Sequence, residues 1–214
     1  MKQIHFNEVV PSFLYDSADY ESEVWGNSFV LNKGESHLVS AFSGRGKTTF
    51  LSLIFGARKD FRGTILLDDQ DTKGLGLNDW SGLRQDKVSM LFQNLRLFEE
   101  LTVKENFLLK TQLSKDFHLD QAEQWLADLD LKDVLNRRCN TLSQGQQQRV
   151  AIVRSLLQRF DWLLLDEPFS HLDKENQQRV FRLVEKRVAE EQAGWIVSSL
   201  GDKHGYTFQR EIAL

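Results

Sequence analysis

The segment from Ser40 to Thr49, Ser-Ala-Phe-Ser-Gly-Arg-Gly-Lys-Thr-Thr, restricts the fold of this chain more than any other stretch. It follows the strand-like run 35–39 and precedes the run 49–55, which predicts a helix. Glycines between a strand and a helix N-terminus let backbone N–H groups turn toward an anion, and the helix dipole favours negative charge there. The segment therefore predicts a phosphate-binding loop, against the alternative of a chance Gly/Ser loop before a helix.

Position within this loop assigns roles to individual residues. Lys47 is expected to reach the terminal phosphates of a nucleotide, and Thr48 to offer its hydroxyl to Mg²⁺. The pattern G-x-x-x-x-G-K-[ST] has Ala41 in place of its first glycine, and a methyl group there restricts the backbone. The predicted nucleotide-binding residues of the loop are Ala41, Phe42, Ser43, Gly44, Arg45, Gly46, Lys47, Thr48 and Thr49.

Length and composition limit the class of protein. A chain of 214 residues is long enough for one sizeable α/β domain and too short for two catalytic domains. A net charge of −4 argues against nucleic acid as the main partner, because binding to its backbone needs clustered positive charge. The single cysteine, Cys139, suits a reducing compartment, and no apolar run approaches the roughly 18 residues of a membrane span. We therefore expect a cytoplasmic protein that meets a membrane only through a partner.

Hydrophobic periodicity and turn residues predict the order of the elements. Helices are expected after the caps Thr102, Asp120 and Ser143 and over residues 174–191. The run 162–165 is apolar on both faces, which is typical of an inner strand of a parallel sheet. Further strands are expected at 2–9, 29–31, 35–39, 63–68, 87–92, 195–198 and 207–213. The mainly helical block 95–140 predicts an inserted subdomain, and 1–92 with 143–214 would form the α/β core.

Four more motifs follow the loop, and together they resemble an ABC-type ATP-binding cassette. The run Leu163-Leu164-Leu165-Asp166-Glu167-Pro168 is similar to the Walker B strand of that family. The run Leu142-Ser143-Gln144-Gly145-Gln146-Gln147-Gln148-Arg149 resembles the family signature, usually Leu-Ser-Gly-Gly-Gln. Gln93 matches the Q-loop, and Ser170-His171-Leu172-Asp173 matches the D-loop, usually Ser-Ala-Leu-Asp.

The resemblance implies a fold and a set of roles. The fold would be a P-loop NTPase of the α/β class, with a mixed sheet flanked by helices, an N-terminal antiparallel β part and the helical subdomain. Asp166 would bind Mg²⁺ with Thr48 and Gln93, and Glu167 would act as general base beside Lys47 and Gln93. The signature residues Ser143, Gly145 and Gln146 would face the γ-phosphate bound to a second copy of the chain. Two ATP molecules would then join a head-to-tail dimer.

Each motif also has a plainer interpretation when it is taken alone. Asp166 and Glu167 could form a solvated turn, and residues 142–149 could be a glutamine-rich helix start. Asp173 would serve as a helix N-cap in either case. The order and spacing of the motifs after a phosphate loop favour the cassette.

Two features of the family do not have their usual form in this chain. The aromatic residue that stacks on adenine would lie about thirty residues before the lysine, where Tyr15, Tyr20 and Trp25 are candidates and Tyr15 is preferred. The switch histidine expected after the penultimate strand is not in register, because Ser198 and Ser199 stand there. His204 lies five residues beyond Ser199 and is interpreted as a surface residue.

The function predicted is that of an ATP-hydrolysing subunit that drives a separate membrane permease from the cytoplasmic face. The run 92–106 is similar to the branch that serves lipoprotein release, cell division and macrolide export. The alternative is an ATP-dependent binding switch with weak hydrolysis, suggested by Ala41, Gln144 and the missing histidine. A soluble cassette of DNA repair or translation is disfavoured, since this chain has neither a long coiled-coil insertion nor a second cassette. A P-loop kinase or GTPase would leave 142–149 unexplained.

Overall fold

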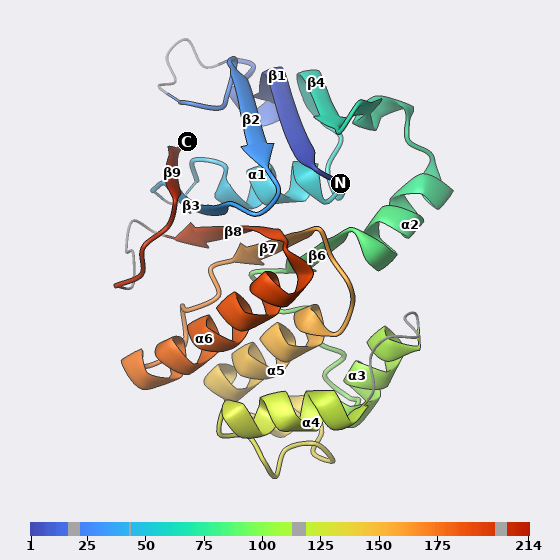
Figure 1. Ribbon diagram of the computed structural model, residues 1–214, viewed down its shortest axis with the longest axis vertical. Helices are drawn as coiled ribbons and strands as arrows, with labels where there is room; N and C mark the ends of the chain where they lie inside the picture. Colours follow the sequence, from blue (N-terminus) through green and yellow to red (C-terminus); the bar gives the residue numbers. More distant parts are fainter. Residues whose placement is uncertain (17–21, 43, 113–118, 200–204) are drawn as a thin grey trace.

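The strands form two sheets that lie on opposite sides of one helix (Figure 1). The computed structural model describes residues 1–16, 22–42, 44–112, 119–199 and 205–214. A parallel sheet has the order β6-β7-β8-β3-β9, and an antiparallel sheet has the order β2-β1-β4-β5. The fold is therefore the mixed α/β fold with an N-terminal antiparallel part that the sequence predicted.

The elements of the two sheets have the following bounds. The parallel sheet contains β3 (Ser36–Ser40), β6 (Val88–Leu91), β7 (Trp162–Asp166), β8 (Gly194–Ser199) and β9 (Arg210–Ala213). The antiparallel sheet contains β1 (Gln3–Pro11), β2 (Ser28–Asn32), β4 (Phe61–Leu67) and β5 (Gln70–Asp71). The helices are α1 (Lys47–Ile54), α2 (Leu77–Asp86), α3 (Val103–Thr111), α4 (Leu119–Asp128), α5 (Gln144–Leu156) and α6 (Lys174–Glu191), with short 3₁₀ turns at Ser12–Leu14, Thr72–Gly74 and Cys139–Thr141.

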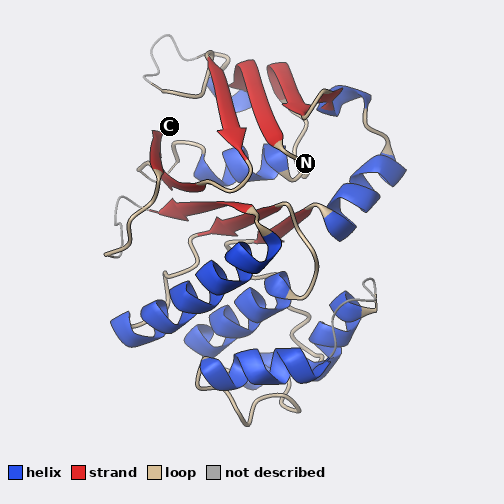
Figure 2. Cartoon of the chain, viewed as in Figure 1, coloured by secondary structure: helices blue, strands red, loops and turns tan. Residues whose placement is uncertain are grey.

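The parallel sheet is covered on both faces, and the sequence of β7 shows why. Trp162 and Leu164 join the hydrophobic cluster between the two sheets, which includes α1. Leu163 and Leu165 join the cluster on the other face, beneath α3, α4, α5 and α6. Successive side chains of a strand point to opposite faces, so a strand buried on both sides must be apolar throughout. Figure 2 shows the resulting layers, with helices on both sides of this sheet.

The helical block 95–140 contains α3 and α4, and both pack beside α5 in one hydrophobic cluster with the sheet. Thr102 caps α3 as predicted, since its hydroxyl accepts from the Glu105 N–H and the Glu105 carboxylate accepts from the Thr102 N–H. The prediction that Asp120 caps α4 is wrong, because α4 already includes Leu119 and Asp120 lies in its first turn. A carboxylate is favourable near the positive N-terminal end of a helix both at the N-cap and in the first turn, so the sequence pattern does not distinguish these two positions.

Helix α2 was not predicted. Its sequence contains Asn78, Asp79 and Gly82, which have low helix propensity. The helix begins where the Gly76 N–H donates to the Asp79 carboxylate at 2.9 Å, and Trp80 is buried on its inner side. Tertiary packing of Trp80 therefore decides the conformation. Among the described residues, no helix is both long enough and apolar enough to cross a bilayer.

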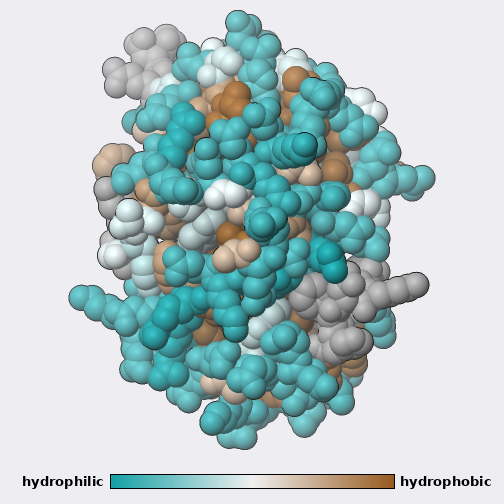
Figure 3. Space-filling model, in the orientation of Figure 1, coloured by the Kyte–Doolittle hydropathy of each residue, from teal (hydrophilic) through white to brown (hydrophobic). Residues whose placement is uncertain are grey.

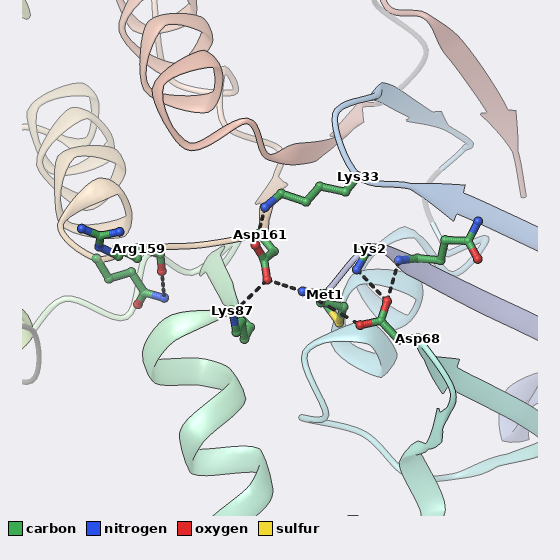
Figure 4. Close-up of polar contacts among 9 residues, drawn as sticks. Met1, Lys2, Lys33, Asp68, Lys87, Arg159 and Asp161 are labelled. Carbon is green, nitrogen blue, oxygen red and sulfur yellow. Dashed lines mark hydrogen bonds and ion pairs between the residues drawn. The ribbon is translucent and has the colours of Figure 1, made fainter.

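A cluster of charged groups lies beside the amino-terminal ends of β1, β6 and β7 (Figure 4). The Asp161 carboxylate, just before β7, pairs with the ammonium groups of Lys33, Met1 and Lys87, the last at 3.3 Å. Burial by itself would raise the pKa of Asp161, but hydrogen bonds from Lys33 and the Met1 ammonium outweigh it and lower the pKa. The carboxylate thus stabilises the fold in its charged form.

We expect Asp161→Asn to lower the free energy of unfolding by about 1–3 kcal/mol at pH 7, between the values typical of surface and buried ion pairs. A lowered folded-state pKa gives stability above the unfolded value of about 3.9, and this stability is lost as the pH falls through the folded value. Urea unfolding should therefore show that the wild type and Asp161→Asn differ less in free energy of unfolding near pH 3 than at pH 7. Asp86→Asn, at an exposed position on α2, is the matched control. A difference that is the same at both pH values would contradict this account.

Candidate active site

The predicted phosphate loop connects β3 to α1. Gly46 has φ +98°, and a Cβ at this residue would lie only 2.8 Å from Cζ of Phe13, so the position requires glycine. No side chain caps α1, which leaves the first-turn N–H groups of the helix directed into the loop. This arrangement suits an anion. Ser43 lies outside the described residues.

Lys47 is folded back over the loop. Its ammonium group donates to the Ala41 carbonyl oxygen at 2.8 Å and lies 3.8 Å from Oε1 of Glu167. Gln93 follows β6, and its amide Nε2 donates to Oε2 of Glu167 at 3.3 Å. Three side chains from β6, β7 and α1, distant in sequence, thus meet at one edge of the parallel sheet.

A cavity of 330 Å³ lies at this meeting point. Seven of its lining residues were predicted for the site from the sequence, and two, Phe13 and Arg58, were not. The lining residues are Phe13, Gly44, Gly46, Lys47, Thr48, Thr49, Arg58, Gln93 and Glu167. Ala41, Phe42 and Arg45 belong to the same loop but do not line the cavity.

The two adjacent acids are held by a residue that the sequence did not single out. Ser198, on β8, lies directly opposite Asp166 in the parallel register. Its hydroxyl donates to Oδ1 of Asp166 at 2.6 Å and accepts from the N–H of Glu167 at 3.0 Å. Glu167 has φ +48°, so its side chain leaves the strand direction and enters the cavity. Ser198 therefore holds the carboxylate of Asp166 and the backbone of Glu167.

Asp166 has one oxygen free for a ligand. The side chain is only 1% exposed, and Oδ2 is buried without a hydrogen-bond partner among the described residues. A buried carboxylate oxygen is costly to leave unpaired, so a bound group there would compensate it. Thr48, Gln93 and Asp166 offer oxygen donors, which are the ligands that Mg²⁺ prefers.

The signature residues do not line the cavity of their own chain. Ser143 caps α5: its hydroxyl accepts from the Gln146 N–H at 3.3 Å, and its N–H donates to Oε1 of Gln146 at 3.0 Å. Further along α5, Gln148 donates to the carbonyl oxygen of Pro168 at 2.9 Å and to that of Glu167 at 3.4 Å. Sequence patterns assigned no role to Gln148. The only local clue to its role was its position on the helix that Ser143 caps.

The aromatic candidates are placed differently from the prediction. Tyr15 does not line the cavity, and the guanidinium carbon of Arg62 lies 4.2 Å from the centre of its ring. Trp25 is buried in the core at 2% exposure, and Tyr20 lies outside the described residues. Phe13, at 41% exposure, is the aromatic residue that faces the loop. The stacking role of Tyr15 stays a prediction, and Phe13, two residues before it, is a further candidate because it lines the cavity.

The position of the expected switch histidine is occupied by the end of β8. Ser199 is the last residue of that strand and is buried. His204 lies outside the described residues.

Comparison with known proteins identifies the family. The ABC transporter family matches residues 25–170, and the chain belongs to that family. The lipoprotein-releasing system ATP-binding protein LolD of Buchnera aphidicola is 33% identical over 160 residues, which cover 73% of this chain and 70% of that protein. The spermidine/putrescine import ATP-binding protein PotA of Protochlamydia amoebophila is 36% identical over 156 residues, which cover 72% of this chain but only 40% of that protein.

Solved structures agree with this assignment. The dimeric structure of MJ0796, a bacterial ABC transporter cassette, has a TM-score of 0.84 and 26% identity, and the match covers 99% of this chain and 94% of that one. A dimeric post-hydrolysis state of MJ0796, bound to ADP and Pi, matches with a TM-score of 0.83. The chain is thus an ATP-binding cassette with the ATPase activity of the ABC type. The relatives include a releasing and an import protein, so they do not single out the predicted branch.

We expect Ser198→Ala to lower the ATPase rate about 10-fold or more, because a misplaced catalytic group is costly. The free energy of unfolding should fall by about 1–3 kcal/mol, since Oδ1 of Asp166 loses its buried donor. Ser198→Thr keeps the hydroxyl and should restore most of the rate. ATPase kinetics and urea unfolding measure both effects, and an unchanged rate in Ser198→Ala would show that the hydroxyl does not position the acids.

Proposed function

We propose that the chain hydrolyses ATP in a head-to-tail dimer with a second copy of itself, and that the dimer drives a separate membrane permease. The observation that carries the proposal is the convergence of Lys47, Gln93 and Glu167 on one cavity beside the phosphate loop. Each ATP would lie between Lys47 of one protomer and Ser143 of the other. Glu167 would accept a proton from the attacking water.

Two features of the chain and one comparison support the dimer. Ser143, Gly145 and Gln146 lie at a helix start that does not reach the cavity of its own chain, so any contact with bound nucleotide must come from another copy. Phe42, in the phosphate loop, is 82% exposed, and a partner surface would remove this ring from water. MJ0796, which shares the fold, forms dimers.

Mg²⁺ fits the same site. Thr48 and Gln93, which line the cavity, would hold it together with Asp166, which precedes the lining residue Glu167. The unpartnered Oδ2 of Asp166 is the structural feature that favours a cation there. When bound, Mg²⁺ would neutralise charge on the phosphate oxygens. Lys47 lines the cavity and lies 3.8 Å from Oε1 of Glu167, so its ammonium group would exchange this contact for the terminal phosphate of ATP.

A permease would have a docking surface near Gln93. An apolar cavity of 180 Å³ opens beside the end of β6, and Phe98 and Leu109 remain 56% and 44% exposed at this place. Its lining includes Phe92, the neighbour of Gln93, so a segment seated there would be linked to the catalytic cavity through one peptide unit. The face of the molecule drawn in Figure 3 is mainly hydrophilic. The cassette would thus lie at the cytoplasmic surface of the membrane, held by its permease.

A binding switch with weak hydrolysis is the second candidate. It is favoured by Ser199 at the end of β8, where the family resemblance led us to expect a histidine. It would bind ATP and dimerise in the same way but turn over slowly. The wild-type rate, measured beside that of the Glu167 variant described next, separates the two: a wild-type rate equal to that of the variant favours the switch.

We expect Glu167→Gln to lower the ATPase rate by about 10²–10⁴-fold, because the amide cannot accept the proton of the water. ATP-dependent dimerisation should persist, since the glutamine leaves the phosphate loop and the signature intact. ATPase assays and size-exclusion chromatography with ATP and Mg²⁺ measure the two effects. Glu175→Gln, at an exposed position on α6, is the control and should hydrolyse ATP normally. Undiminished turnover in Glu167→Gln would show that another group is the base.

We further propose that Phe13, rather than the predicted Tyr15, stacks on adenine. Base–aromatic stacking is worth about 1–3 kcal/mol, so Phe13→Ala should weaken ATP binding about 5- to 100-fold while Phe13→Tyr keeps it. Tyr15→Ala is the matched control and should change the affinity little. Titration with a fluorescent ATP analogue measures this. A loss confined to Tyr15→Ala would restore the original assignment.

A further inference from the structure

The loop between β7 and α6 carries an exposed histidine that the reaction described so far does not use. His171 lies between Glu167, which lines the cavity, and Asp173, which caps α6 by accepting from the Asn176 N–H at 2.8 Å. Among the described residues, the imidazole has no hydrogen-bond or ion-pair partner, although the rest of the loop is well held. For example, Ser170 donates to the Glu167 carbonyl oxygen at 3.2 Å.

The backbone of His171 is fixed against the signature. A Cβ on Gly145 would lie 2.9 Å from the carbonyl oxygen of His171, so the loop and the start of α5 touch at this point. Gly145 cannot gain a side chain without moving the loop, since the near atom belongs to the backbone. Any surface that meets Ser143 and Gly145 must therefore also meet the region of His171.

The cavity itself contains no imidazole among its described lining residues. The described end of β8, beside Asp166, carries the serines Ser198 and Ser199. Lys47 is the ammonium group at the terminal-phosphate position, and the guanidinium of Arg58 is paired with Asp60. A preorganised donor at the charge that develops during phosphate transfer is commonly worth about 10²–10³ in rate.

We propose that His171 of each protomer completes the active site of the other, by donating an N–H hydrogen bond to the terminal phosphate held by Lys47 of that other protomer. This inference rests on the proposed head-to-tail dimer, which brings Ser143 to the same nucleotide. The imidazole keeps its proton: the water gives its proton to Glu167 and its oxygen forms the new bond to phosphorus, while ADP leaves. His171 acts as a catalytic residue in trans.

The first experiment tests the residue in isolation. His171→Ala should lower kcat about 10²- to 10³-fold and change the apparent affinity for ATP little. His171→Gln keeps an N–H donor, so it should recover part of kcat. Lys174→Ala, at the exposed first residue of α6, is the control and should retain the wild-type rate.

The second experiment tests the action in trans by mixing protomers. Lys47→Ala has no working nucleotide site but keeps His171, whereas His171→Ala keeps Lys47. An excess of Lys47→Ala should therefore restore turnover at the nucleotide site of His171→Ala. The same excess of Lys47→Ala/His171→Ala should lower the turnover of the wild type, because each wild-type site then faces a protomer without the imidazole. If the first mixture regains no turnover and the second loses none, His171 acts within its own chain and the proposal is wrong.

The failure of this inference can be told apart from the failure of the dimer. Glu167→Gln and Glu167→Gln/His171→Ala should dimerise equally with ATP, which shows that the loss of rate is not a loss of pairing. If both dimerise and His171→Ala retains full turnover, the inference is wrong and the dimer stands. If Glu167→Gln does not dimerise with ATP, the head-to-tail arrangement itself is wrong, and this inference falls with it.

Discussion

The parallel pairing of β3 and β7 with the strand between them, β8, is the constraint on which the site depends. In a parallel sheet, all strands place their carboxyl ends at one edge. The phosphate loop leaves the end of β3, and Asp166 and Glu167 stand at the end of β7. The registers Ser40–Ser199 and Asp166–Ser198 keep the two ends level. A shift of β7 by one residue would turn Asp166 to the opposite face of the sheet and break its hydrogen bond with Ser198.

The same edge concentrates polar groups that are expensive to bury. Lys47 and Asp166 are 6% and 1% exposed, and each is stabilised by specific contacts: Lys47 with the loop carbonyl and Glu167, Asp166 with Ser198. The free energy needed to hold these groups comes from the two hydrophobic clusters on either side of the sheet. A rigid, doubly covered sheet is thus what allows a charged cavity at its rim.

Sequence patterns predicted most of the fold because local signals and tertiary packing agree there. The apolar run of β7, the cap at Ser143 and the full extent of α6 are examples. The sequence patterns failed where tertiary packing overrides local helix propensity. Helix α2 is the example, since it forms around the buried Trp80 although its residues are weak helix formers. In the site, glycines and acids at fixed spacing predicted the phosphate loop and the pair at 166–167. Phe13 and Ser198 were missed, because they approach from β1's end and from β8, and contacts between distant segments leave no local pattern.

The hydrogen bonds of Gln148 give α5 a second consequence. The helix begins at Gln144, after the exposed cap Ser143, and Gln148, on its second turn, donates to the carbonyl oxygens of Glu167 and Pro168. The start of α5 and the backbone of Glu167 are therefore joined by one helix and one side chain. A partner that moved the start of this helix would also move Gln148 and, with it, the carbonyl oxygen of Glu167. In the proposed dimer, this connection would make the position of Glu167 in one protomer depend on the nucleotide bound to the other.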